Sequence, residues 1–188
     1  MWILAIMGGI LLVLLTALIT MYNGLVAGRV KVHESFSGMY VQMKRRADLI
    51  PNLIETVKGY AEHERETLES VTRLRTQFLD ADKKNDQVAM VAAGNTLSGA
   101  LKSLFVLSER YPDLKASENF KALQKSLEET EDQIAAARRI YNANVSDYNM
   151  SVKQFPSNIM ARWFSFAEEP FFEVDGSVAT PPSVAFTS

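Results

Sequence analysis

The chain has 188 residues and no cysteine, which excludes disulfides, thiolate nucleophiles, zinc fingers and lipoprotein acylation. Its net charge is −2, and 20 lysines and arginines are scattered among 22 aspartates and glutamates. The composition offers no basic face for nucleic acid, and the length suits one domain with a real core.

The first expected element is an apolar segment over residues 2–21, WILAIMGGILLVLLTALITM, which carries no charge. About twenty apolar residues, each rising about 1.5 Å, span a hydrocarbon core of about 30 Å. A cleavable signal peptide is the alternative, but no lysine or arginine precedes the run and no cleavage site is clear. We predict an uncleaved, single-pass anchor over residues 1–21. Gly8 and Gly9 could let two anchors approach closely, although glycines are common in membrane helices.

The cations that flank this segment predict its orientation. Only the terminal amine precedes it, whereas Arg29, Lys31 and the basic run at residues 44–46 follow it. The positive-inside tendency therefore places the rest of the chain in the cytoplasm, with the anchor in the bacterial cytoplasmic (inner) membrane.

Residues 22–78 are expected to form one long helix, because apolar residues recur every three or four positions, as in an amphipathic helix or a coiled-coil seam. This stripe contains Met39, Met43, Ile50, Ile54, Val57, Ala61, Leu68, Val71 and Phe78. Pro51 interrupts the stripe without shifting its phase, so a kink near Pro51 is predicted. The alternative is a new helix that starts at Pro51, with Asp48 capping its first turn.

Three further helices are expected along the chain. The second covers residues 86–110 and ends before Pro112, and the third begins after an N-cap at Ser117 and runs to residue 155. A short fourth helix follows Pro156. The bundle is assigned to residues 22–174, and residues 175–188, which have little to bury, are predicted to be a disordered tail.

Several blocks of this sequence resemble the LemA family over roughly residues 22–173. They are MKRRADLIPNLIETVKGYAEHE, ERYPDLKASENFKALQ, LEETEDQIAAARRIYN, DYN and FPSNIMA, in that order. The resemblance implies a membrane-anchored, mostly helical protein, and it supplies no catalytic motif.

The polar residues include few candidates for a site. His33 and His63 lack the convergent partners of a metal site, and solvated charged faces are favoured for them. The basic run of Lys44, Arg45 and Arg46 could touch anionic headgroups, but pairing with the acids at residues 128–132 is favoured. Tyr60, Tyr141 and Tyr148 are expected in the core, with their hydroxyls reaching its rim.

The aromatic cluster at residues 163–166 could belong to a helix that lies on the membrane. A cap that packs over the end of the bundle is the favoured interpretation.

The sequence thus predicts an all-α protein: one transmembrane helix, then an elongated antiparallel bundle of three long helices and a short fourth. The second helix is too short to cover the start of the first, so an apolar face is expected to be left exposed. We interpret that face, made of Leu25, Phe36, Met39 and Met43, as a self-association surface. A fold-back at Gly38 within one chain is the alternative.

The predicted function is a non-enzymatic scaffold that self-associates as a homo-oligomer at the lipid bilayer. The alternative is an adaptor for another membrane protein, such as a membrane protease or transporter. No cofactor, metal or nucleic acid is expected, because no nucleophile–base pair, phosphate loop or metal cluster occurs in the sequence.

Overall fold

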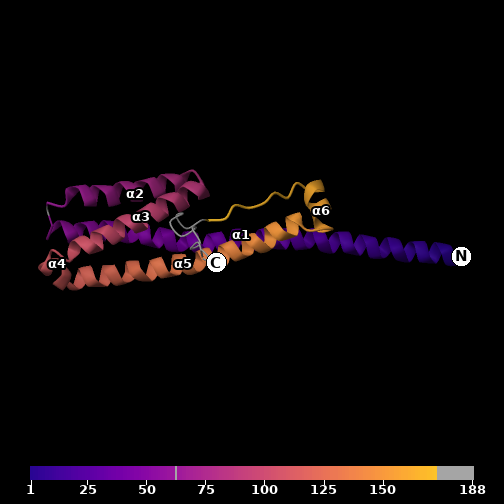
Figure 1. Ribbon diagram of the computed structural model, residues 1–188, viewed down its shortest axis with the longest axis horizontal. Coiled ribbons are helices and arrows are strands. Elements are labelled where there is room, and N and C mark those ends of the chain that lie inside the picture. Colours follow the sequence, from indigo (N-terminus) through magenta and orange to yellow (C-terminus); the bar gives the residue numbers. More distant parts are fainter. Residues whose placement is uncertain (62, 173–188) are drawn as a thin grey trace, which may run out of the picture. The chain divides into compact units, whose positions relative to one another are not determined.

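The structure is a computed structural model that describes residues 1–61 and 63–172. Its helices are α1 (Trp2–Lys58), α2 (Arg65–Lys83), α3 (Gln87–Ser108), α4 (Pro112–Ala116), α5 (Glu118–Lys153) and α6 (Ser157–Trp163) (Figure 1). The described residues contain no strand, so the predicted all-α class is confirmed. The tail predicted over residues 175–188 lies outside the described residues.

The predicted single helix over residues 22–78 is wrong, because α1 ends at Lys58 and α2 begins only at Arg65. Gly59 follows the last helical residue, and the amide of Ala61 donates to the Val57 carbonyl at 2.9 Å to close the turn. The apolar stripe had concealed this break, because Val57, Ala61 and Leu68 all face one core across the turn. Helix α1 does continue through Pro51, so the alternative of a helix that starts there is also wrong.

The chain divides into two compact units, and the long helices α1 and α5 contribute a part to each. The first unit is Met1–Tyr40 with Ala135–Phe171, and the second contains Val41–Ile134. Each unit has its own buried apolar cluster.

The second unit has a core built from all the helices that pass through it. Its most deeply buried side chains come from α1, α2, α3, α4 and α5, and include Leu53, Val57, Val71, Leu97, Leu104, Leu114 and Phe120. Asp86 caps α3 by accepting from the Ala89 amide at 2.9 Å. The predicted N-cap at Ser117 is confirmed, since its hydroxyl accepts from the Phe120 amide at 3.4 Å.

In the first unit, α5 runs antiparallel to α1 and packs against it. Phe36 and Tyr141 form an edge-to-face ring pair with centroids 6.2 Å apart. Nearer the N-terminus, Gly28 lies so close to α5 that an added Cβ would be 3.2 Å from Tyr148 Cδ2. Leu25 then packs in the cluster formed with α6, where Met160 and Ala161 are buried.

The predicted self-association face is therefore covered within one chain. Leu25, Phe36, Met39 and Met43 are all buried, with exposed fractions between 0 and 7%. The premise of an exposed stripe was wrong because it paired α1 with the 22-residue α3, whereas α5 has 36 residues and is about 54 Å long. The fold-back at Gly38 is also wrong, because α1 remains helical through that residue.

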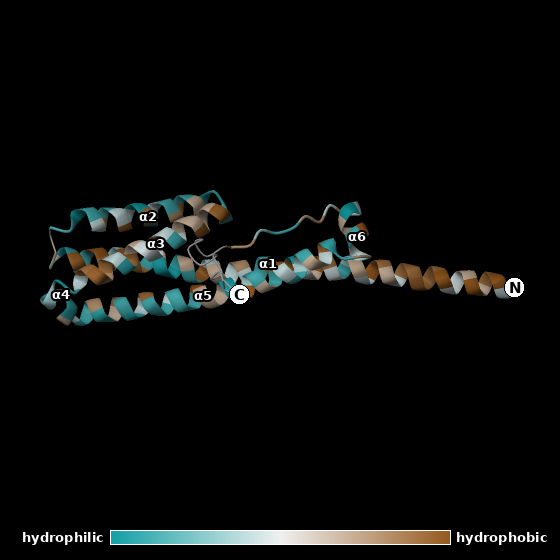
Figure 2. Ribbon diagram, viewed as in Figure 1, coloured by the Kyte–Doolittle hydropathy of each residue, from teal (hydrophilic) through white to brown (hydrophobic). Residues whose placement is uncertain are grey.

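The start of α1 has the properties of a membrane anchor. Figure 2 shows it as a mostly hydrophobic ribbon with a few paler turns, and the most apolar window of α1 has none of its residues buried. The hydroxyls of Thr16 and Thr20 donate to the Leu12 and Ala17 carbonyls at 2.7 and 2.9 Å, so both polar groups are satisfied within the helix.

By length and composition, α3 could also cross a membrane. Its Leu97, Leu101 and Leu104 are buried in the core of the second unit, which accounts for its hydropathy.

Candidate functional site

An open pocket of about 750 Å³ lies in the second unit, where α2 turns back along α1. Its lining residues are Ile54, Lys58, Arg65, Leu68, Glu69, Thr72 and Arg73. Ile54 and Leu68 are buried and form an apolar floor. The pocket thus combines a surface that can bury apolar groups with a rim of long charged side chains.

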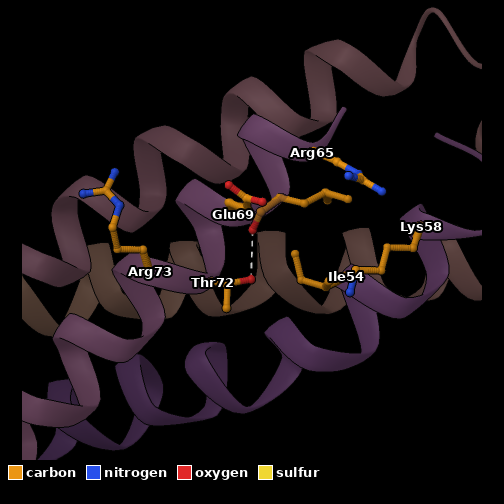
Figure 3. Close-up of a pocket in the computed structure, with 7 residues that line it drawn as sticks. Ile54, Lys58, Arg65, Glu69, Thr72 and Arg73 are labelled. Atoms are coloured by element: carbon orange, nitrogen blue, oxygen red, sulfur yellow. Dashed lines mark hydrogen bonds between the residues drawn. The ribbon is translucent and has the colours of Figure 1, made fainter. Parts of the chain in front are cut away.

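Figure 3 shows Lys58 and Arg65 at one end of this pocket and Arg73 at the other, with Glu69 between the two arginines. Within the described residues, no ion pair joins any of these three cations to an acid. With three cations against one carboxylate, the rim favours a negatively charged ligand.

The local sequence explains how the rim forms. Arg65, Glu69 and Arg73 are four residues apart and therefore share one face of α2. The turn after Lys58 brings that face beside the last turns of α1. Arg75 donates to the Ala47 carbonyl at 2.8 Å, and Lys44 pairs with Asp82 at 3.2 Å, so the two helices are antiparallel.

Sequence reasoning missed this pocket. The spacing of Arg65, Glu69 and Arg73 was a visible signal, but a continuous helix would have left Lys58 and these residues along one rod with no cavity between them. The turn between α1 and α2 creates the pocket, and Gly59, which disfavours a helix interior, is the local signal that could have revealed it.

A second polar cluster lies inside the same unit, around Arg46. This side chain is only 2% exposed. It donates to Glu131 Oε2 at 2.6 Å, to the Ser98 hydroxyl at 2.5 Å and to the Gly94 carbonyl at 2.9 Å. Ser98 also donates to Glu131 at 2.8 Å, so the charge on α1 is tied to both α3 and α5.

Gly94 permits this close approach of α1 to α3. A Cβ added there would lie 3.2 Å from Met43 Sδ and 3.3 Å from Arg46 Nη2. The absence of a side chain at this position therefore leaves room for the buried guanidinium.

The three residues of the predicted basic run, Lys44, Arg45 and Arg46, have different surroundings. Arg46 pairs with Glu131, which confirms the expected pairing with the acids of residues 128–132. Lys44 pairs instead with Asp82 on α2, and Arg45 is exposed. The ion pairs of Arg46 and Lys44 thus join α1 to α5 and to α2.

The tyrosines occupy different environments. Tyr141 is buried as predicted and donates to the Pro170 carbonyl at 3.0 Å, and burial raises the pKa of its hydroxyl to about 12. Asn149 Nδ2 donates to the Glu169 carbonyl at 2.8 Å, and Asn149 Oδ1 accepts from the Glu169 backbone amide at 2.9 Å. Residues 169–170 are thereby held against α5. Tyr60 is exposed, contrary to the expectation of a core position.

Tyr111 makes a surface contact that joins the ends of α3 and α4 to the α1–α2 turn. Its hydroxyl donates to Glu64 Oε1 at 2.9 Å, and Arg110 bonds the same oxygen at 3.2 Å. The hydrogen bond to Glu64 is the main cause that raises the pKa of Tyr111.

His33 and His63 are both exposed. Among the described residues, no three histidines, aspartates or glutamates come together as a group that could hold a metal ion. The second unit thus has two polar features: the ion-paired cluster around Arg46, and the α1–α2 pocket, whose charges favour an anion.

Comparison with known proteins gives three informative similarities. Protein LemA of Metamycoplasma hominis is 28% identical over 141 residues, which cover 74% of this chain and 63% of that protein. Magnetosome protein MamQ 1 of Paramagnetospirillum magneticum is 25% identical over 190 residues, covering 89% and 70% of the two chains. Magnetosome protein MamQ of Magnetospirillum gryphiswaldense is 24% identical over 194 residues, covering 91% and 71%.

The apolar N-terminal part of α1, which is not buried, and the helices that follow it along the chain indicate a membrane-associated helical protein. The LemA family model matches residues 35–186, which is most of the chain. The protein belongs to the LemA family, which confirms the resemblance found in the sequence.

Proposed function

We propose that this protein is a non-enzymatic, membrane-anchored adaptor whose α1–α2 pocket binds an acidic amphipathic segment of another membrane protein, such as a membrane protease or transporter. The observation that carries the proposal is the pocket itself, with an apolar floor and a rim of Lys58, Arg65 and Arg73 against Glu69.

The chemistry of the pocket favours this kind of ligand. An apolar side chain buried on Ile54 and Leu68 contributes about 1.5–3 kcal/mol. The arginines can each hold a carboxylate through two parallel hydrogen bonds, which selects the ligand's charge and orientation. An amphipathic helix that presents both kinds of side chain on one face matches such a groove.

The double substitution Arg65→Glu and Arg73→Glu should weaken binding of an acidic amphipathic peptide at least about tenfold, a loss of about 1.4 kcal/mol. The probe is a labelled helical peptide with leucines on one face and glutamates beside them. Fluorescence anisotropy with the full chain in detergent measures its affinity. A peptide with lysines in place of glutamates should bind more weakly to the wild-type protein.

The matched control changes two exposed cations away from the pocket, Arg45→Glu and Lys125→Glu, which alters the net charge by the same amount. It should leave the affinity within about twofold. Equal weakening in both double variants would mean that the peptide responds to net charge, and the pocket would not be its site.

The adaptor is proposed to face the cytoplasm from the inner membrane, because Arg29 and Lys31 follow the anchor and cations that flank a membrane span favour the cytoplasmic side. Protease added to cells with a permeabilised outer membrane should leave the helices after residue 78 intact. Cleavage there, under conditions that spare a cytoplasmic marker, would place the helices on the other side.

A self-associating scaffold is the second candidate. Gly8 and Gly9 have open space around them, so two anchors could pack closely there. Mass photometry in detergent distinguishes the candidates, because a scaffold should give a defined large oligomer and an adaptor a monomer that associates with one partner.

A further inference from the structure

An exposed aromatic surface lies where α5 gives way to α6. Phe155, in the turn between these helices, is 76% exposed, and Trp163, at the end of α6, is 73% exposed. Ile159 is exposed between them, while Met160 and Ala161 on the other face of α6 are buried against Leu25. The predicted packing of this helix as a cap is thus observed for one face only.

The pairing of α5 with α1 fixes the level of this surface along the anchor helix. Phe36 meets Tyr141, Gly28 meets Tyr148, and Met21 packs in the same cluster as Val152. Each step toward the C-terminus of α5 is therefore matched by an equal step toward the N-terminus of α1. Phe155 comes level with Met21, the last residue of the apolar segment.

Two ring contacts hold the segment after α6 at the same level. Tyr22 follows the apolar segment directly, and its ring lies edge-to-face with Phe164, with centroids 4.9 Å apart. A second edge-to-face contact joins Tyr22 to Phe166 at 5.8 Å. Beyond α6, the N-terminal part of α1 extends with no neighbouring element among the described residues of this unit (Figure 1).

We propose that Phe155, Ile159 and Trp163 insert into the interfacial region of the bilayer leaflet from which α1 emerges, so that the protein touches the membrane at two places. An anchor that ends at Met21 leaves the hydrocarbon at the level of these side chains. Aromatic side chains are favoured at that depth, because their rings bury apolar area beside hydrated headgroups.

The charges near this surface indicate which lipid composition is sufficient for the insertion. Lys153, next to the turn, is paired with Glu168 at 2.8 Å, Arg162 is exposed beside Trp163, and the three side chains of the contact surface are apolar. The insertion thus depends on the hydrophobic and aromatic side chains, and a phosphatidylcholine bilayer without anionic lipid supports it.

The first test uses the fluorescence of Trp163. The chain has two tryptophans, so Trp2→Phe leaves Trp163 as the single reporter in the full-length protein. In phosphatidylcholine nanodiscs, lipids brominated near the headgroup should quench Trp163 more strongly than lipids brominated near the chain ends. Aqueous acrylamide should quench it less than in the protein unfolded by denaturant.

The matched control moves the tryptophan along α5. Ile140 is 59% exposed in the same unit and lies 15 residues before Phe155, about 22 Å away along the helix axis. With Trp2→Phe and Trp163→Phe, an Ile140→Trp reporter should be quenched by acrylamide and not by brominated lipid.

Equal lipid quenching at both positions, or none at Trp163, would overturn the proposal. A Trp163 shielded from acrylamide but untouched by brominated lipid would mean that protein covers the surface, whether a second copy or another chain. Spin labels on Phe155→Cys and Ile140→Cys repeat the comparison without tryptophan, and oxygen should reach the label at 155 more readily than a water-soluble nickel complex.

Discussion

Replacing Glu131 with leucine should lower the free energy of unfolding by about 3–5 kcal/mol, although Glu131 itself is partly exposed. The cost arises at its partner, because Arg46 is 2% exposed and would lose the Glu131 carboxylate with which its guanidinium pairs at 2.6 Å. Ser98 and the Gly94 carbonyl would remain as neutral acceptors, which cannot replace a counter-charge. Denaturant unfolding of the full chain in detergent, followed by circular dichroism, measures the loss.

Removing both charges together should restore most of the stability. With Arg46→Met and Glu131→Leu, both members of this ion pair are removed, and well-packed apolar replacements of a buried ion pair are often neutral or stabilising. If the double variant is as unstable as Glu131→Leu alone, the loss comes from packing and not from the guanidinium's missing carboxylate at residue 131.

The Lys44–Asp82 pair provides the control for surface ion pairs in the same unit. Lys44 is 43% exposed, so water already solvates its ammonium group, and Lys44→Ala should cost about 1 kcal/mol or less. A loss from Glu131→Leu as small as that from Lys44→Ala would show that Arg46 gains charge compensation from solvent after all.

Much of the fold could be predicted from the sequence, because its signals are local. The apolar period of α5, the helix end before Pro112, the cap at Ser117 and the uncharged run before Tyr22 each depend on neighbouring residues alone. The break between α1 and α2 could not be predicted by period, because the turn preserves the phase of Val57, Ala61 and Leu68.

The missed turn also explains why the sites were assigned imperfectly. Without it, Arg65 and Arg73 had no second helix to form a pocket with, and Asp82 could not be brought back to Lys44. The pairing of Arg46 with Glu131 was accessible, because it requires only that α5 lie against α1. Which helix covers a given part of the apolar face of α1 depends on tertiary packing. The comparison of expected helix lengths considered α3, whereas α5 is the helix that packs on Phe36.

A substitution at Phe36 should have opposite outcomes if this face packs against α5 within one chain, as in the structure, or against a second copy, as the sequence suggested. Phe36→Ala should lower the free energy of unfolding by about 3–5 kcal/mol, because the ring is 7% exposed and packs edge-to-face on Tyr141. The measurement is denaturant unfolding of the full chain in detergent, with the oligomeric mass recorded in parallel by mass photometry.

Val30→Ala provides the control, since Val30 lies on the same helix, is well exposed and should change stability by no more than about 0.5 kcal/mol. If Phe36 belonged to a surface between copies, Phe36→Ala would reduce the oligomeric mass and leave the unfolding of the single chain nearly unchanged. The contact with Tyr141 requires the reverse: α5 should be released from α1 within one chain, and the mass should stay the same.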